Sequence, residues 1–125
     1  MASLTRQKRG LTSYHAGKAA EDSVARVYAR TGHETLAKRW RGSAGEIDLI
    51  AQNGDGVIFI EVKKSKSHAL AVQRITPRQL ERIYGAGAEF LSSMPNGQLT
   101  DVRIDVALVD EVGRVNVIEN VSMAA

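Results

Sequence analysis

The stretch of sequence that decides the fold is residues 45–63, which read GEIDLIAQNGDGVIFIEVK. Two runs rich in Ile, Val and Phe flank the turn NGDG at 53–56, and Asn, Asp and Gly all tolerate positive φ. This pattern predicts a β-hairpin with strands at about 46–52 and 57–64. Both strands carry charges inside runs that otherwise resemble buried strands.

These charges are Asp48, Glu61 and Lys63. Side chains alternate between the two faces of a strand, so their spacing predicts the face on which each one lies. Glu61 and Lys63 share a face because they are two residues apart. An even hairpin loop puts Asp48 on that same face, whereas an odd loop or a bulge does not. A four-residue loop sets Asp48 opposite Glu61, with Cβ atoms about 4.5–5.5 Å apart. Such carboxylates repel, so Lys63 or, better, a divalent cation must neutralise them.

A simpler interpretation is that Asp48 ends a strand in solvent and that Glu61 and Lys63 form an exposed pair. Against it, the run at 57–60 is apolar on both faces, which is typical of a central, covered strand. The three residue types also suit phosphodiester cleavage. The two acids would hold Mg²⁺ or Mn²⁺, which polarises the scissile phosphate and acidifies bound water. Lys63 would orient that water or stabilise the transition state.

The rest of the chain predicts helices on either side of this hairpin. The patterns predict a helix at about 15–31, a short strand at 34–40, a loop at 41–45, a second helix opening at Thr76-Pro77-Arg78-Gln79, and strands at 102–109 and 114–119. A helix between the third and fourth strands requires a crossover, so those strands should be parallel. We therefore expect an α/β fold with a central mixed β-sheet flanked by helices, in the order αβββαβ plus a final strand.

The bulk properties describe one small domain. The length of 125 residues predicts a single domain at 14–120, with a flexible basic N-terminus at 1–13 and a tail at 121–125. The absence of cysteine excludes disulfides and thiolate metal sites and fits a reducing compartment, so we expect a cytoplasmic protein. No apolar run approaches the ~20 residues of a membrane span.

Charge is distributed unevenly along the chain. Residues 1–42 carry a balance of +6 and residues 101–125 a balance of −3. The basic front half suits a polyanion such as nucleic acid, although a solvated surface with uneven charge gives the same count.

Several motifs carry a resemblance to known nucleases. Asp48 followed by Glu61-Val62-Lys63 resembles the PD-(D/E)xK signature of the restriction-endonuclease-like superfamily, with Ile47 in place of the usual proline. The segments at 17–21, 45–51, 59–63 and 76–78 (GKAAE, GEIDLIA, FIEVK and TPR) resemble the YraN family. Its members are small bacterial proteins regarded as candidate endonucleases and similar in outline to Holliday-junction resolvases. The resemblance covers about residues 14 to 110.

This resemblance implies a restriction-endonuclease-like core and a Mg²⁺-dependent endonuclease acting on DNA, with branched or structured DNA among its substrates. It implies that the catalytic residues are Asp48, Glu61 and Lys63, and that the metal is bound by Asp48, Glu61 and Glu21. Glu46 would be an accessory residue of the site. The residues implied to contact nucleic acid are Lys64, Lys66, Arg39, Arg41 and Arg78. By spacing alone, Glu21 lies either at the rim of the helix's apolar stripe or in solvent beside Asp22. Glu46 either lines the site or caps the preceding glycine loop.

Other residues stay open at this level. Trp40 either stacks on a nucleic-acid base or packs on a sheet edge. The arginines at four-residue spacing on the second helix either line a groove for the nucleic-acid backbone or lie on a solvated helix face; they are Arg74, Arg78 and Arg82. Asp105 supports either the sheet or the site. The alternative function is a non-catalytic module that binds nucleic acid or a protein partner and retains the nuclease fold. A single site in a small chain favours a homodimer for cutting two strands, but the sequence contains no visible dimer seam.

Overall fold

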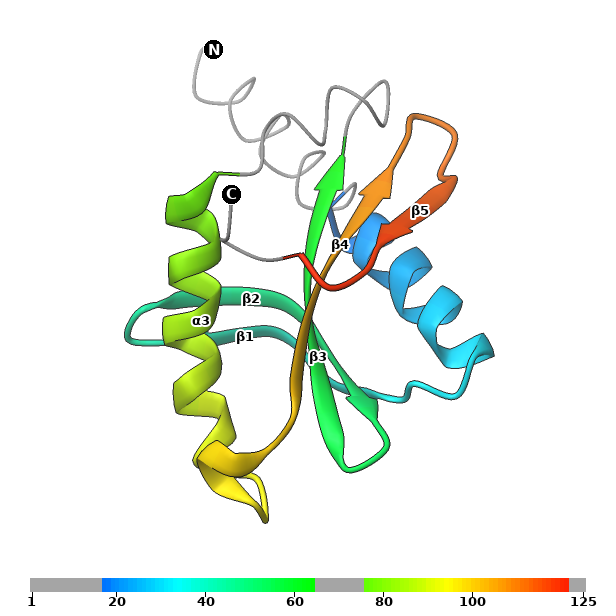
Figure 1. The fold of residues 1–125 in the computed structure, drawn as a ribbon. Helices are drawn as coiled ribbons and strands as arrows, with labels where there is room; N and C mark the ends of the chain where they lie inside the picture. The colour runs from blue at the N-terminus through cyan, green and yellow to red at the C-terminus, as the bar shows by residue number, and fades with distance from the viewer. Residues whose placement is uncertain (1–16, 65–75, 122–125) are drawn as a thin grey trace, which may run out of the picture.

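The computed structural model describes residues 17–64 and 76–121 and confirms the expected α/β order (Figure 1). The elements are an N-terminal helix at 17–30, β1 (Thr35–Gly42), β2 (Gly45–Asn53), β3 (Gly56–Lys64), α3 (Pro77–Leu91), the short 3₁₀-helix η1 (Gly97–Leu99), β4 (Val102–Val109) and β5 (Val115–Ile118). The expected flexible N-terminus at 1–13 lies outside the described residues, as does most of the expected tail. No helix in the described part is long and apolar enough to cross a membrane.

The five strands form one mixed sheet in the order β1-β2-β3-β4-β5. β3 and β4 are parallel, and the other three pairs are antiparallel. The parallel pair is the one predicted from the intervening helix α3. The predicted loop at 41–45 is shorter than expected, because Gly42 already pairs with Gly45 across a turn of Ser43 and Ala44.

The β2–β3 register decides where the acidic residues lie. Asn53 pairs with Gly56, so the hairpin closes over an even turn of two residues, and Leu49 pairs with Ile60. Continuing this register by one residue sets Asp48 across from Glu61. The turn is even, as the prediction of a shared face requires, although it has two residues rather than the four that were expected to set the two acids opposite each other.

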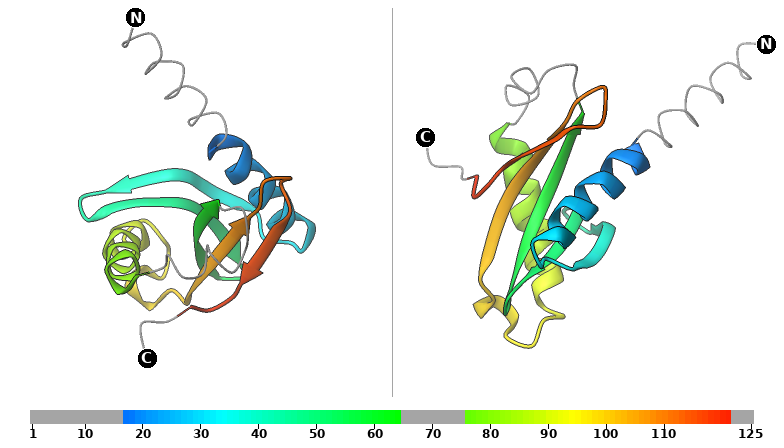
Figure 2. Two further views of the ribbon diagram at one scale, coloured as in Figure 1. Left: turned by 90° about the horizontal axis from the view of Figure 1, so that it is seen from above. Right: turned by 90° about the vertical axis from the view of Figure 1, so that its right-hand side faces the viewer.

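A helix covers each face of the sheet (Figure 2), and a hydrophobic layer lies between each helix and the sheet. On one face, the N-terminal helix packs Val24 and Tyr28 against Leu49 and Ile60. On the other face, α3 packs a second cluster, whose buried members are Ile47, Ile50, Val57, Phe59, Leu80, Ile83, Ala86, Leu91 and Ile104. β3 lies between the two layers, which explains why its sequence is apolar on both faces.

The start of α3 is fixed by a capping box. The Gln79 N–H donates to the Thr76 hydroxyl at 3.2 Å, and the Thr76 N–H donates to the Gln79 side chain at 2.9 Å. Pro77 occupies the first turn, where its missing N–H costs nothing. This cap confirms the predicted helix start.

Further along α3, Gly87 lies against the Phe59 ring of β3, where a Cβ would come within 2.3 Å of the ring.

The β1–β2 hairpin bends as it leaves the sheet and curls toward α3 (Figure 1). Ile47 and Ile50 are three residues apart yet both pack in the α3 cluster, which regular alternation would forbid. β2 therefore changes its facing at Asp48. Across from it in β1, Arg39 has φ of 49°, an uncommon value for a residue other than glycine. The change of facing at Asp48 and the unusual backbone of Arg39 therefore lie directly across from each other in the β1–β2 pair.

Candidate active site

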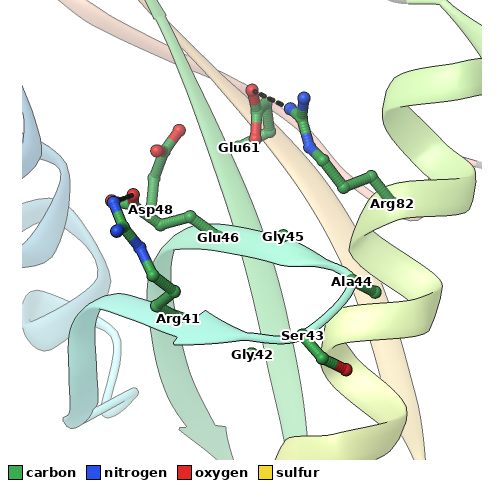
Figure 3. Close-up of a pocket in the computed structure, with 9 residues that line it drawn as sticks. All are labelled: Arg41, Gly42, Ser43, Ala44, Gly45, Glu46, Asp48, Glu61 and Arg82. Atoms are coloured by element: carbon green, nitrogen blue, oxygen red, sulfur yellow. Dashed lines mark hydrogen bonds and ion pairs between the residues drawn. The ribbon is translucent and has the colours of Figure 1, made fainter.

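Asp48 and Glu61 line a single pocket of about 530 Å³ between the β1–β2 hairpin, β3 and α3. Figure 3 shows both carboxylates pointing into this space from neighbouring strands. The pocket is lined by Arg41, Gly42, Ser43, Ala44, Gly45, Glu46, Asp48, Glu61 and Arg82. The structure thus brings the predicted acid pair together.

Asp48 is the most perturbed acid of the site. Its Oδ2 accepts a hydrogen bond from the Val62 N–H at 2.8 Å. Burial raises the pKa of Asp48 to about 7, and the nearby charge of Glu61 adds to the rise. Glu21 and Glu46 raise this pKa further, whereas the Val62 hydrogen bond lowers it. Three carboxylates therefore act on Asp48, which forms no ion pair within the described part of the chain.

Glu61 is paired with a cation from its own strand. Its side chain is buried, and Lys63 Nζ lies 3.2 Å from its Oε1. Arg82 Nη2 approaches the same oxygen to 4.0 Å. Glu61 and Lys63 share a face, as the alternation predicts. With Glu61 only 7% exposed, the interpretation of an exposed pair does not fit.

Glu21 faces inward from the N-terminal helix. It is buried, and both carboxylate oxygens accept from Arg39 Nε, at 3.1 and 2.9 Å. Its neighbour Asp22 takes the surface position and pairs with Lys38 at 2.8 Å. The sequence left Glu21 open between the stripe rim and solvent, and the structure places it at the rim. Arg39, expected on nucleic acid, is directed at Glu21.

Glu46 lines the pocket and pairs with Arg41 at 3.3 Å. Arg41 is 80% exposed, so this pair contributes little to stability and leaves Arg41 accessible to a ligand. In the sequence, Arg82 is one of a series of three arginines with Arg74 and Arg78, whereas in the structure it lies on α3 at the pocket wall. The four-residue spacing of the series was the only signal for it.

Two of the other residues expected on nucleic acid, Lys64 and Arg78, do not line the pocket. Lys64 is exposed at the end of β3, and Arg78 is exposed in the first turn of α3. Lys66 lies outside the described residues. Trp40 packs edge-to-face on Phe90, with ring centroids 5.7 Å apart. Of the two interpretations of Trp40, packing is therefore the one that the structure supports.

Contacts between the hairpin tip and α3 were not foreseen from the sequence. Glu89 of α3 accepts hydrogen bonds from the Ser43 N–H, at 2.8 Å, and from the Ser43 hydroxyl. A Cβ on Gly42 would come within 2.1 Å of Glu89, and a Cβ on Gly45 within 2.3 Å of Arg82. A Cβ at either position would therefore force the Glu89 or the Arg82 side chain to move, and the φ of 149° at Gly45 also favours glycine.

Asp105 belongs to a separate buried network. It is fully buried and accepts hydrogen bonds from the Tyr28 hydroxyl at 2.6 Å, from Arg103 at 2.9 Å and from the Asn120 N–H at 3.0 Å. Burial and the Asp105 carboxylate raise the pKa of Tyr28, so the phenol stays protonated as the donor. These bonds connect the N-terminal helix to β4. Of the two roles left open, Asp105 supports the sheet.

Comparison with known proteins shows the family to which the chain belongs. Residues 20–109 match the family model described as "Uncharacterised protein family UPF0102". The chain belongs to the UPF0102 family. A UPF0102 protein of Cereibacter sphaeroides is 62% identical over 111 residues, covering 89% of this chain and 95% of that protein. UPF0102 proteins of Ruegeria pomeroyi (52% identical, 90% and 91% covered) and Dinoroseobacter shibae (42%, 94% and 88%) are also similar.

The acids of this UPF0102 chain have the donor chemistry for a hard divalent cation, since Mg²⁺ prefers carboxylate oxygen. Asp48 in particular is a desolvated acid beside other acids, and a cation would relieve that repulsion. Within residues 17–64 and 76–121, however, no three Asp, Glu or His side chains already converge on one point as metal ligands. Glu21 and Glu61 are instead turned toward Arg39 and Lys63.

Proposed function

We propose that this protein is a metal-dependent endonuclease of the PD-(D/E)xK type that hydrolyses phosphodiester bonds in DNA with Mg²⁺ or Mn²⁺. The observation that carries the proposal is the acid pair in the pocket. Asp48, whose pKa is raised to about 7, shares the pocket with Glu61, and Lys63 lies 3.2 Å from Glu61. Strongly perturbed acids in a cleft are typical of functional sites. A stabilising core gains nothing from this repulsion.

Each residue has a defined task in this proposal. Asp48 and Glu61 hold the cation, Glu21 is the third acid on it, and Glu46 lines the approach. When bound, the metal polarises the phosphate and acidifies water. Lys63 donates a hydrogen bond to the attacking water or to a phosphate oxygen, and its partial burial strengthens that interaction. Glu21 and Glu61 must give up part of their contacts with Arg39 and Lys63 to reach a common cation.

The substrate class and the assembly are also part of the proposal. The resemblance to Holliday-junction resolvases extends it to branched or structured DNA. A homodimer would supply two sites for two strands. Of the residues predicted to contact nucleic acid, Arg41 has the most suitable position, because it lines the pocket and its side chain is exposed.

A second candidate function is a binding module that keeps the nuclease fold without cleavage. It is favoured by the ion pairs that hold Glu21 and Glu61, because a pocket closed by its own cations needs no metal. Such a module would bind nucleic acid in EDTA. It would also bind more tightly when Asp48→Asn removes a repulsive charge near the phosphates.

The test is cleavage of a panel of branched, nicked, flapped and linear DNA with Mg²⁺ or Mn²⁺. Wild type should cut at least one structure, and Asp48→Ala and Lys63→Ala should each lose this activity. Asp55→Ala, in the exposed β2–β3 turn, is the matched control and should keep it. Cleavage that survives both pocket substitutions would mean contamination or a different site. Metal-independent binding without cleavage would favour the binding module.

A further inference from the structure

Three of the cations around the pocket pair closely with acids, whereas Arg82 makes only a long ion pair. The close pairs are Glu21 with Arg39 at 2.9 Å, Glu46 with Arg41 at 3.3 Å, and Glu61 with Lys63 at 3.2 Å. Arg82 reaches only 4.0 Å from Glu61, whose oxygen Lys63 already holds more closely. That distance is too long for a hydrogen bond. Within the described part of the chain, the Arg82 guanidinium therefore has no hydrogen-bonded partner, and its ion pair with Glu61 is long.

The position of Arg82 is nevertheless well defined. A Cβ added to Gly45 would come within 2.3 Å of Arg82 Cγ and 2.5 Å of its Cδ, so the stem of Arg82 lies directly on the Gly45 backbone. Gly45 has φ of 149°, outside the range that other residues favour. The stem is thus held between α3 and the hairpin, while the guanidinium extends toward Glu61 at the pocket (Figure 3).

We infer that Arg82 is a phosphate-binding residue that holds the nucleic-acid backbone beside the scissile phosphate, and that Gly45 positions it. The inference rests on the proposed function and deepens it. A guanidinium presents N–H donors in a planar fork that matches two phosphate oxygens. Arg82 has these donors available, is 45% exposed, and lines the same pocket as Asp48 and Glu61. A phosphate there would supply the close oxygen acceptors that Arg82 does not reach at 4.0 Å from Glu61.

The experiment measures DNA binding, which does not require cleavage. Fluorescence anisotropy with a labelled four-way junction and a labelled duplex is recorded in Ca²⁺ over a series of NaCl concentrations. Wild type is compared with Arg82→Gln, Arg82→Lys and Arg30→Gln. Arg30 is the matched control, because it is an exposed arginine at the far end of the N-terminal helix and does not line the pocket. Thermal melting of each variant checks that it is folded.

Arg82→Gln should weaken binding about tenfold and reduce the slope of log affinity against log salt by about 1, whatever the sequence of the DNA. Arg82→Lys should fall between it and wild type, because lysine keeps the charge and loses the fork. Arg30→Gln should match wild type. Equal binding by Arg82→Gln and wild type, or an equal loss in Arg30→Gln, would overturn the inference.

The binding experiment and the cleavage panel, run on the same variants, let the two proposals fail separately. If binding depends on Arg82 but no metal supports cleavage, the nuclease proposal fails and the phosphate site stands. If the protein cleaves DNA and Arg82→Gln binds and cleaves as wild type does, the phosphate site fails and the nuclease stands. Absence of any salt-dependent binding by wild type would overturn both.

Gly45→Ala tests how Arg82 is held. It should weaken binding by displacing the Arg82 stem, and the double variant with Arg82→Gln should bind no worse than Arg82→Gln alone. Such non-additivity is expected when one residue acts through another. Additive losses in the double variant would show that Gly45 does not act through Arg82.

Discussion

Replacing Asp48 by asparagine should stabilise the protein at high pH. The folded protein keeps the Asp48 proton to a pKa of about 7, whereas the ordinary value is 3.8. The folded state therefore binds more protons than the unfolded chain between these values, so this group lowers wild-type stability as pH rises from about 4 to 7. Asparagine cannot ionise, and its side-chain oxygen can still accept the Val62 N–H. Asp48→Asn removes the penalty and keeps the hydrogen bond.

The magnitude follows from the shift. One pKa unit corresponds to about 1.4 kcal/mol, so the rise from 3.8 to about 7 sets an upper limit of about 4 kcal/mol on the gain. The gain of Asp48→Asn over wild type should be near zero at pH 4, grow between pH 4 and 7, and stay constant above that range. Mg²⁺ at pH 8 should stabilise wild type and narrow the difference, because a bound cation offsets the same repulsion.

Urea denaturation at several pH values measures this difference directly. Asp55→Asn is the control, since Asp55 lies in an exposed turn and should show no such pH-dependent gain. The reasoning would be refuted if Asp48→Asn were no more stable than wild type at pH 8. A gain of equal size at pH 4 and pH 8 would also refute it, because the charge would then not be the cause.

Three further substitutions have defined outcomes. Lys63→Ala should reduce cleavage at least 100-fold and destabilise the fold by about 1–3 kcal/mol, because buried Glu61 loses its close cation; a kinetic assay and urea denaturation measure the two effects. Tyr28→Phe should lower the free energy of unfolding by about 1–3 kcal/mol, because the hydrogen bond to Asp105 is lost, and should leave cleavage by the folded protein unchanged. A parallel loss of activity would show that this network acts on the site. Gly87→Ala should lower the free energy of unfolding by about 1–3 kcal/mol, because the added methyl group would press on the Phe59 ring. An unchanged melting temperature would contradict that packing.

Local rules in the sequence predicted most of the fold. The even turn determines the β2–β3 register, which runs to the pair Leu49–Ile60, next to Asp48 and Glu61. Alternation put Glu61 and Lys63 on one face, and the Thr-Pro-Arg-Gln segment gave the capping box of α3. These features depend on residues close in sequence or on strict periodicity, so one sequence is enough to find them.

Long-range contacts were beyond these rules. The pairing of Glu21 with Arg39 joins residues 18 apart through the unusual backbone of Arg39, which no composition rule predicts. The network around Asp105 includes Tyr28, 77 residues away. The role of Gly45 under Arg82 depends on how closely the hairpin approaches α3. Each of these is set by tertiary packing rather than by local pattern.

The central claim is that Asp48 and Glu61 jointly hold a divalent cation. The most direct test is the anomalous difference density of crystals grown or soaked with Mn²⁺. The account predicts a peak bridged by carboxylate oxygens of Asp48 and Glu61, with the contact between Lys63 and Glu61 lengthened from 3.2 Å. Ordered Asp48 and Glu61 side chains with no peak between them at saturating Mn²⁺, or a peak only at other residues, would contradict it.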